Sequence, residues 1–359
     1  MAKNLIIGSC EPFSGKSAFV LGMARYFLSA KKEVRLGKPL ATTLELLPEK
    51  DSSGKLVDDD VRFIGDTLGL SDHQLIPSID FLSPETAEIR FMESNLTPGE
   101  EFSAFEKQVN DPFEGINILE AAGSLHEGRL YGLSLVEISR NLDIPVLFIH
   151  LWRDSRSIDD LLEAKNQLGE NFAGVVLNAV TPNEISNIKS KVIPALERLG
   201  IEVYGVMPRS PLLRSVSVDE LARRLEARII CCPEKLDLLV ETLSIGAMGV
   251  NSAMEFFRKR RNMAVVTGAD RTDLQLAALE ASTQCLILTG VGEPLPQLVN
   301  RSEELEVPLL KVERDTLSTV EVIENAFGHV RLHESVKASY AFRLVEEHCD
   351  LDRLSKRLS

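Results

Sequence analysis

The sequence has few of the features that are typical of secreted proteins, membrane-spanning proteins or proteins stabilised by a structural metal ion. Its 359 residues include five cysteines, an odd number without a Cys-x-x-Cys pair, which predicts neither a disulfide framework nor a zinc site. No apolar run approaches the length of a membrane span, and the opening MAKNLIIGSC lacks the basic and apolar regions of a signal peptide. We therefore expect a cytoplasmic protein that does not contact membranes.

Positive charge is also scarce. The chain has 40 Lys and Arg against 54 Asp and Glu, a formal net charge of −14, which repels phosphate backbones and anionic lipid. Nucleic acid is therefore not expected as a partner, and the one dense cationic run, FFRKRRN at 256–262, is typical of a solvated helix end. The sequence contains no Gly-x-Ser-x-Gly elbow and no His-Glu-x-x-His pair, so serine-hydrolase and zinc-enzyme functions have no support.

Strand-length apolar runs alternate with helical patterns through the first 210 residues. The runs are rich in Val, Ile and Leu without a strict period of two, which is typical of parallel strands covered on both faces. Strands are predicted at 4–9, 33–40, 116–123, 145–151, 172–180 and 202–208, and helices at 17–32, 132–143, 157–169 and 184–200. The alternation predicts an α/β fold with a doubly wound, mostly parallel sheet.

The alternation of apolar strands and helical patterns changes after residue 210. A second, smaller α/β block runs to about residue 330 and contains two successive strand-to-loop junctions, VVTGADRTD and LILTGVGEP. The segment 335–359 is predicted to be helical, and its apolar positions indicate docking or a partner contact. We therefore divide the chain into a first domain at 1–210, a second at 211–330 and a C-terminal helical tail at 331–359.

One loop in the first domain nearly matches a phosphate-binding loop. In CEPFSGKS, Gly15, Lys16 and Ser17 fit the pattern, whereas Cys10 stands where the first glycine is expected. An apolar strand precedes the loop and a long helix follows it, so backbone N–H groups and the helix N-terminus would face a phosphate. Lys16 would neutralise phosphate charge and Ser17 would ligate Mg²⁺. The alternative is a polar turn that contains GKS by chance.

Further polar residues lie at predicted strand ends. Glu120 ends a buried strand and is followed by small residues, a setting in which a carboxylate can hold a metal or orient water. Lys38, at the end of another strand, would bring a second cation near the phosphates. The acidic run 58–60 is more often a helix N-terminal cluster than a metal site. For Glu120 and Lys38 the alternative is a solvated side chain at a strand end.

These pieces together resemble a known arrangement. IIGSCEPFSGKSAFVLG, GKPL, LEAAGSLHEGRLYGLSLVEISRNLDIPVL and GVVLNAV resemble the dethiobiotin synthetase-like P-loop domain at the N-terminus of long phosphotransacetylases. The stretch AVVTGADRTDLQLAALEASTQCLILTGVGEPLP then resembles the DRTGG domain that follows it in that family. The similarity covers roughly residues 3–330 in the same order. It makes Gly8 the anchoring glycine of a longer loop, GSCEPFSGKS, and Cys10 a variable position.

The resemblance implies the roles of individual residues. Lys16 and Lys38 would be the catalytic cations, with Lys38 near the reacting phosphate. Mg²⁺ would be held by Ser17, Glu120 and Asp60. Nucleotide binding would involve Glu11, Ser14, Gly15, Lys16, Ser17 and Asn178, of which Asn178 would read the adenine.

The resemblance also has departures. In the second domain Asp270, Arg271 and Thr272 match the start of the DRTGG motif, whereas Asp273 and Leu274 replace its two glycines. The synthetase stretch EGAGG appears here as EAAGS, which argues against dethiobiotin formation. The family's catalytic domain of several hundred residues has no counterpart before Ser359, so acetyl transfer is expected to be absent.

From these features we expect a cytoplasmic regulatory or adaptor protein that binds ATP and Mg²⁺ and forms a homo-oligomer. The resemblance implies a protein partner in acetyl or central carbon metabolism. Two alternatives stay open: an ATP-dependent ligase that works through an acyl phosphate, with weak ATPase activity as its minimal form, and a structural homo-oligomer whose P-loop is vestigial.

Overall fold

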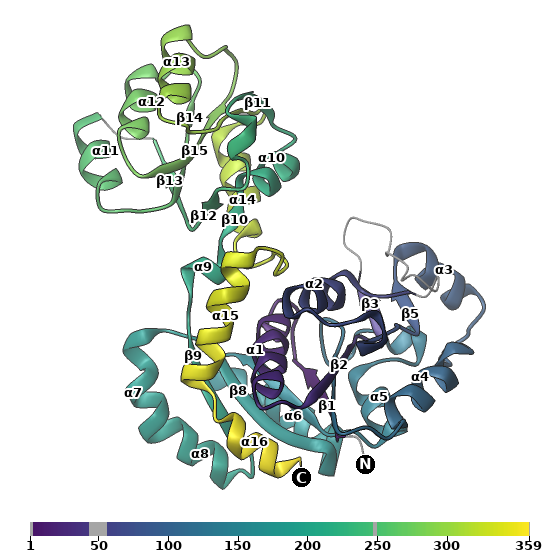
Figure 1. The fold of residues 1–359 in the computed structure, drawn as a ribbon. Coiled ribbons are helices and arrows are strands. Elements are labelled where there is room, and N and C mark those ends of the chain that lie inside the picture. The colour runs from purple at the N-terminus through teal and green to yellow at the C-terminus, as the bar shows by residue number, and fades with distance from the viewer. Residues whose placement is uncertain (1–2, 43–55, 247–249, 359) are drawn as a thin grey trace. The chain divides into compact units, whose positions relative to one another are not determined.

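The computed structural model describes residues 3–42, 56–246 and 250–358, with the side chains of 250–252 excepted, and forms two compact units. The first unit comprises residues 1–209 together with 331–359, and the second comprises 210–330. The segment 331–359, expected as a separate tail, is therefore part of the first unit (Figure 1).

The first unit is built on a seven-stranded parallel sheet. Its strand order is β4-β2-β6-β1-β7-β8-β9, with every neighbouring pair parallel. In that order the strands are Leu75–Ile76, Glu33–Gly37, Gly115–Glu120, Lys3–Gly8, Val146–Leu151, Phe172–Val180 and Val203–Pro208. The prediction of a doubly wound, mostly parallel sheet is confirmed. The strand order reverses around β1, and in such sheets ligands bind at the carboxyl ends of the strands beside the reversal.

Helices cover both faces of this sheet (Figure 1). They are α1 (Lys16–Ser29), α2 (Asp59–Leu68), α3 (Pro84–Met92), α4 (Glu101–Asn110), α5 (Leu135–Leu142), α6 (Ile158–Leu168), α7 (Ile185–Asn187), α8 (Ile193–Arg198), α15 (Ser335–His348) and α16 (Leu351–Arg357). The helix expected at 184–200 is interrupted by a π-helical turn at Ile188–Val192. No helix within the described ranges is long and apolar enough to cross a membrane.

The strand expected at 33–40 divides in two. β2 ends at Gly37, and β3 (Leu40–Thr42) pairs with β5 (Asp80–Leu82) in a separate two-stranded sheet. The break places Lys38 between the two strands, at the carboxyl end of β2.

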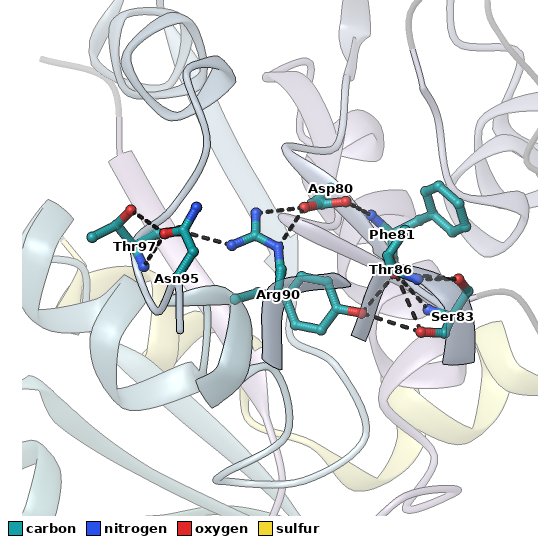
Figure 2. Close-up of polar contacts among 8 residues, drawn as sticks. Asp80, Phe81, Ser83, Thr86, Arg90, Asn95 and Thr97 are labelled. Atoms are coloured by element: carbon teal, nitrogen blue, oxygen red, sulfur yellow. Dashed lines mark hydrogen bonds and ion pairs between the residues drawn. The ribbon is translucent and has the colours of Figure 1, made fainter. Parts of the chain in front are cut away.

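A polar network fixes β5 to α3 at the side of the first unit (Figure 2). Arg90 donates two hydrogen bonds to Asp80 Oδ2, at 2.7 and 3.2 Å, and a third to the Thr97 carbonyl. Thr86 Oγ1 lies 2.7 Å from the Tyr131 hydroxyl, over whose ring the Arg90 guanidinium stacks. These hydrogen bonds join β5, α3 and the loop after it, and so stabilise this part of the scaffold.

Helix α1 is buried because α15 covers it (Figure 1). A Cβ added to Gly22 would lie 2.5 Å from the Cβ of Val345, so the two helices approach closely at this glycine. The Arg25 guanidinium also lies over the Phe342 ring, 4.2 Å from its centre. The apolar positions that indicated docking of the tail are thus used within the chain.

The second unit is a smaller α/β fold. Its five-stranded sheet has the order β11-β16-β15-β14-β13, and all pairs are parallel except β11 with β16. The strands are Arg228–Cys231, Leu309–Lys311, Thr283–Thr289, Met263–Gly268 and Thr242–Ile245, and β10 (Val216–Ser217) pairs antiparallel with β12 (Leu239–Val240). The helices are α9 (Pro211–Arg214), α10 (Val218–Leu225), α11 (Val250–Phe257), α12 (Thr272–Leu279), α13 (Pro296–Glu304) and α14 (Thr316–Ala326). Separate apolar clusters cover its two faces.

Candidate functional site

The phosphate loop connects β1 to α1 at the point where the strand order reverses. β1 ends at Gly8 and α1 begins at Lys16, so the loop spans residues 9–15. Gly15 has a φ of +94°, a left-handed conformation that favours glycine, and an added Cβ would collide with Asn178 Nδ2. Gly8 is constrained by packing, since its Cβ would lie 2.5 Å from Leu135 Cδ2.

Lys16 is buried at the first position of α1. Its Nζ donates to Ser9 Oγ at 2.9 Å and to the Gly123 carbonyl at 3.0 Å. Burial lowers the pKa of Lys16 to about 8, although the nearby Glu120 opposes that shift. The Lys16 ammonium is thus hydrogen-bonded by two neutral oxygens, the Ser9 hydroxyl and the Gly123 carbonyl.

Ser17 and Glu120 form a second contact across the site. Ser17 Oγ donates to Glu120 Oε1 at 2.9 Å, and Glu120 is the buried last residue of β6. Burial raises the pKa of Glu120 to about 7, while the charge of Lys38 lowers it and that of Asp60 raises it. The expected pair of serine and strand-end carboxylate is therefore assembled.

Lys38 lies between two carboxylates. Its Nζ is 2.9 Å from Asp60 Oδ2 and 3.2 Å from Asp58, and all three side chains are buried. Burial alone would lower the pKa of Lys38, but the two aspartates raise it. Burial would likewise disfavour ionisation of Asp60, but Lys38 and the other cations hold its pKa well below the usual range.

The acidic run 58–60 is both a helix cap and part of the site. Asp58 Oδ1 accepts from the Asp60 N–H at 2.9 Å, which caps α2, and its other oxygen accepts from the Thr42 N–H at 2.8 Å. Asp58 and Asp60 both accept from Lys38, and Asp60 leaves its other oxygen, Oδ1, without a hydrogen bond. The structure shows the helix-cap role of this run, and the role of Asp60 as a metal ligand stays a prediction.

Three buried oxygen atoms of the site have no hydrogen-bond partner among the described residues: Ser14 Oγ, Glu120 Oε2 and Asp60 Oδ1. Leaving a buried acceptor unsatisfied costs about 1–3 kcal/mol, so such a group of oxygens indicates a place for a ligand. Mg²⁺ binds through one or two carboxylates together with water and substrate phosphates. The donor set of Ser17, Glu120 and Asp60 fits that chemistry. No three His, Cys, Asp or Glu side chains gather into a metal-binding group within the described part of the chain.

Glu11 lies in the loop, and Asn178, from β8, contacts the loop. Asn178 Nδ2 donates to the Ser14 carbonyl at 2.7 Å, and its Oδ1 accepts from the Ala179 N–H at 2.7 Å. Asn178 therefore braces the loop, and adenine reading by this residue stays a prediction. The Glu11 carboxylate pairs with Arg153.

The sequence reasoning missed two residues from the C-terminal segment. Arg331 Nη1 lies 3.1 Å from Asp59 Oδ2, and its other terminal nitrogen donates to the Thr42 carbonyl. His333 Nε2 lies 3.5 Å from Asp60 Oδ1, and the His333 ring packs against Phe63 at 5.2 Å between ring centres. These residues stand in an irregular polar stretch that carries no motif, so no sequence signal identified them.

The predicted motif of the second unit lies at the carboxyl end of β14. Asp270 and Arg271 follow the strand and Thr272 begins α12. The Arg271 N–H donates to the Gly268 carbonyl at 3.1 Å, and its side chain pairs with Asp273 at 3.3 Å. Gln275 Nε2 also donates to the Gly268 carbonyl, at 2.8 Å. This set stabilises the turn after the strand.

Comparisons with known proteins match both units. Residues 3–217 match the family described as AAA domain, and residues 220–326 match the family described as DRTGG domain. Phosphate acetyltransferase of Nitratidesulfovibrio vulgaris is 24% identical over 383 residues, covering 100% of this chain and 52% of that protein. The enzyme of the same name from Synechocystis is 23% identical, covering 99% and 51%. The chain thus spans about half the length of the curated relatives it matches.

Solved structures give more distant matches. The CBS and DRTGG domains of the regulatory region of Clostridium perfringens pyrophosphatase, complexed with diadenosine tetraphosphate, are 14% identical, with a TM-score of 0.30 over 45% of this chain and 76% of that one. The cell division protein MinD of Aquifex aeolicus is 14% identical, with a TM-score of 0.33 over 59% of this chain and 84% of that one.

Proposed function

Since the chain belongs to the AAA domain family and carries a DRTGG domain after the P-loop unit, we propose that it is a regulatory or adaptor protein that binds ATP and Mg²⁺. The observation that carries this proposal is the group of unpartnered buried oxygens beside two buried lysines, at the reversal of the strand order. An ion pair or a hydrogen bond with a ligand would remove the cost of leaving these oxygens unsatisfied.

The residues of the site would divide the work of binding. The N-terminus of α1 would favour a phosphate, and Lys16 would exchange its bonds to Ser9 and Gly123 for phosphate oxygens. Ser17 and Glu120 would hold the cation, whose positive charge offsets that of the phosphates. Lys38 would stabilise Asp60 in its ionised form beside them.

The connection between the second unit and the C-terminal segment supports a regulatory function. The second unit ends at Val330, and the next residue, Arg331, already pairs with Asp59 next to the site. A change at the site can therefore reach the connection to the DRTGG unit over a single residue. The partner that we propose is a protein of acetyl or central carbon metabolism, because the curated relatives are phosphate acetyltransferases. We place it in the cytoplasm, where its five unpaired cysteines would stay reduced.

One observation favours an enzyme as the second candidate. Lys16 and Lys38 are both buried in a single site, and two such cations suit the stabilisation of a transferred phosphoryl group. An ATP-dependent ligase would then release ADP only with its second substrate present, and Glu120→Gln would abolish that release. The regulatory function predicts no such dependence.

Calorimetry tests the shared basis of both functions. Mg-ATP is titrated into the wild-type protein, into Lys16→Ala and into the control Lys259→Ala, which removes an exposed lysine. A charge-assisted hydrogen bond is worth about 1.5–3 kcal/mol, so Lys16→Ala should weaken binding about 10- to 100-fold. The control should bind like the wild type. Absence of binding heat in the wild-type protein would refute the proposal and favour a vestigial P-loop.

A further inference from the structure

The segment from Arg331 to Glu334, called the return segment here, contacts two acidic residues of the site, Asp59 and Asp60. Arg331 pairs with Asp59, and His333 faces Asp60 Oδ1. Both aspartates lie in the first turn of α2, which begins next to Lys38. The return segment therefore contacts the same short stretch that supplies a predicted Mg²⁺ ligand.

The two oxygens of Asp60 are used differently. Oδ2 accepts from Lys38 at 2.9 Å, whereas Oδ1 is buried without a hydrogen bond and has His333 Nε2 at 3.5 Å. A distance of 3.5 Å is too long for a good hydrogen bond. Oδ1 is thus the oxygen that can accept from a new ligand, and His333 Nε2 is the ring atom beside it.

The return segment is anchored on both sides. On its C-terminal side, Lys337 pairs with Glu334 at 3.0 Å, and α15 is packed against α1. On its N-terminal side, the carbonyl of His329 accepts from Arg224 of the second unit at 2.9 Å. Only Val330 separates that anchor from Arg331, so the chain has little slack to absorb a displacement.

We propose that Arg331 and His333 are residues of the nucleotide and cation site, and that Mg²⁺ bound with nucleotide displaces His333 from Asp60. The displacement shifts the return segment together with the Arg331 contact to Asp59, and the shift is passed through Val330 to the DRTGG unit. This inference rests on the proposed function, because it requires Mg-ATP at the P-loop. It adds that the chain's own segment competes with the cation.

Competition between His333 and Mg²⁺ predicts a change in ligand affinity that a purely structural role of His333 does not predict. Removing a competitor tightens binding of the cation complex and leaves cation-free nucleotide unaffected. His333→Ala should therefore bind Mg-ATP about two- to fivefold more tightly than the wild type, the range expected for a partly exposed polar contact. In EDTA the same variant should bind ATP as the wild type does. His73→Ala, which removes an exposed histidine of the first unit, is the matched control and should change neither affinity.

Hydrogen exchange provides the second measurement. Saturating Mg-ATP should raise amide exchange in peptides covering 330–334, whereas ATP in EDTA should not. His333→Gln is tested beside His333→Ala, and unchanged thermal midpoints show that both variants fold. If the wild type binds no Mg-ATP, the proposed function and this inference both fail. If it binds, but both His333 variants leave the affinity unchanged or weaken it with and without Mg²⁺, the inference fails and the proposed function stands.

Discussion

Replacing Lys38 by methionine would test how far this lysine is needed for the fold as well as for the ligand. Lys38, Asp58 and Asp60 are all at most 7% exposed, and the lysine is the cation nearest to both carboxylates. Lys38→Met keeps most of the side-chain volume but leaves two buried carboxylates close together without their cation. Breaking a buried ion pair from one side costs about 3–5 kcal/mol. We expect the free energy of unfolding of the first unit to fall by that amount at neutral pH.

Two further measurements separate charge from packing. The double variant Lys38→Met with Asp60→Asn removes a charge from each side and should recover about half of the loss or more. Protonation of the remaining carboxylates at acid pH should also shrink the deficit of the single variant, since the neutral acids need no cation. Both effects would be absent if the loss came from altered packing.

Urea unfolding followed by tryptophan fluorescence is the appropriate assay. Trp152 is the only tryptophan in the sequence and is buried in the first unit, so its emission reports unfolding of that unit alone. Transitions are measured at neutral and mildly acidic pH for the wild type and the single and double variants. A Lys38→Met transition that matches the wild type at neutral pH would refute the reasoning and would leave Lys38 free to act on the ligand.

Two other predictions concern the same unit. Burial lowers the pKa of His150 from 6.5 to about 4, so the folded state binds this proton less tightly than the unfolded state. The free energy of unfolding should therefore fall by about 3 kcal/mol as the pH drops from 6.5 toward 4. His150→Gln should remove that part of the acid sensitivity in the tryptophan assay. Gly22→Ala should lower the thermal midpoint because its Cβ meets Val345, and Val345→Ala in the same chain should restore part of it; a Gly22→Ala protein as stable as the wild type would contradict the close packing of α15 on α1.

Much of the fold followed from local patterns. The apolar strands without a period of two predicted a parallel sheet covered on both faces, and the first unit has a sheet of seven parallel strands. Errors arose where a tertiary contact overrides local pattern. The strand expected at 33–40 divides at Lys38, whose partners Asp58 and Asp60 lie about twenty residues further along the chain. The helix expected at 184–200 contains a π-helical turn at Ile188–Val192, just before Pro194, which lacks the N–H of a regular helix hydrogen bond.

The candidate site was predictable where its residues lie at the ends of strongly patterned elements. Lys16 and Ser17 follow β1, and Glu120 ends β6, so the meeting of parallel strand ends brings them together. Arg331 and His333 could not be found in this way, because their place depends on the docking of α15 far along the chain.

The contribution of the C-terminal segment also bears on the choice between regulator and ligase. A ligase needs room beside the phosphates for a second substrate, whereas here the chain's own Arg331 and His333 contact the two aspartates next to Lys38. A regulator needs a change in ligand to alter the connection between two units, and Val330 makes that connection one residue from the site. The contacts of Arg331 and His333 beside Lys38, one residue from that connection, suit communication, which is why we rank regulation above ligation.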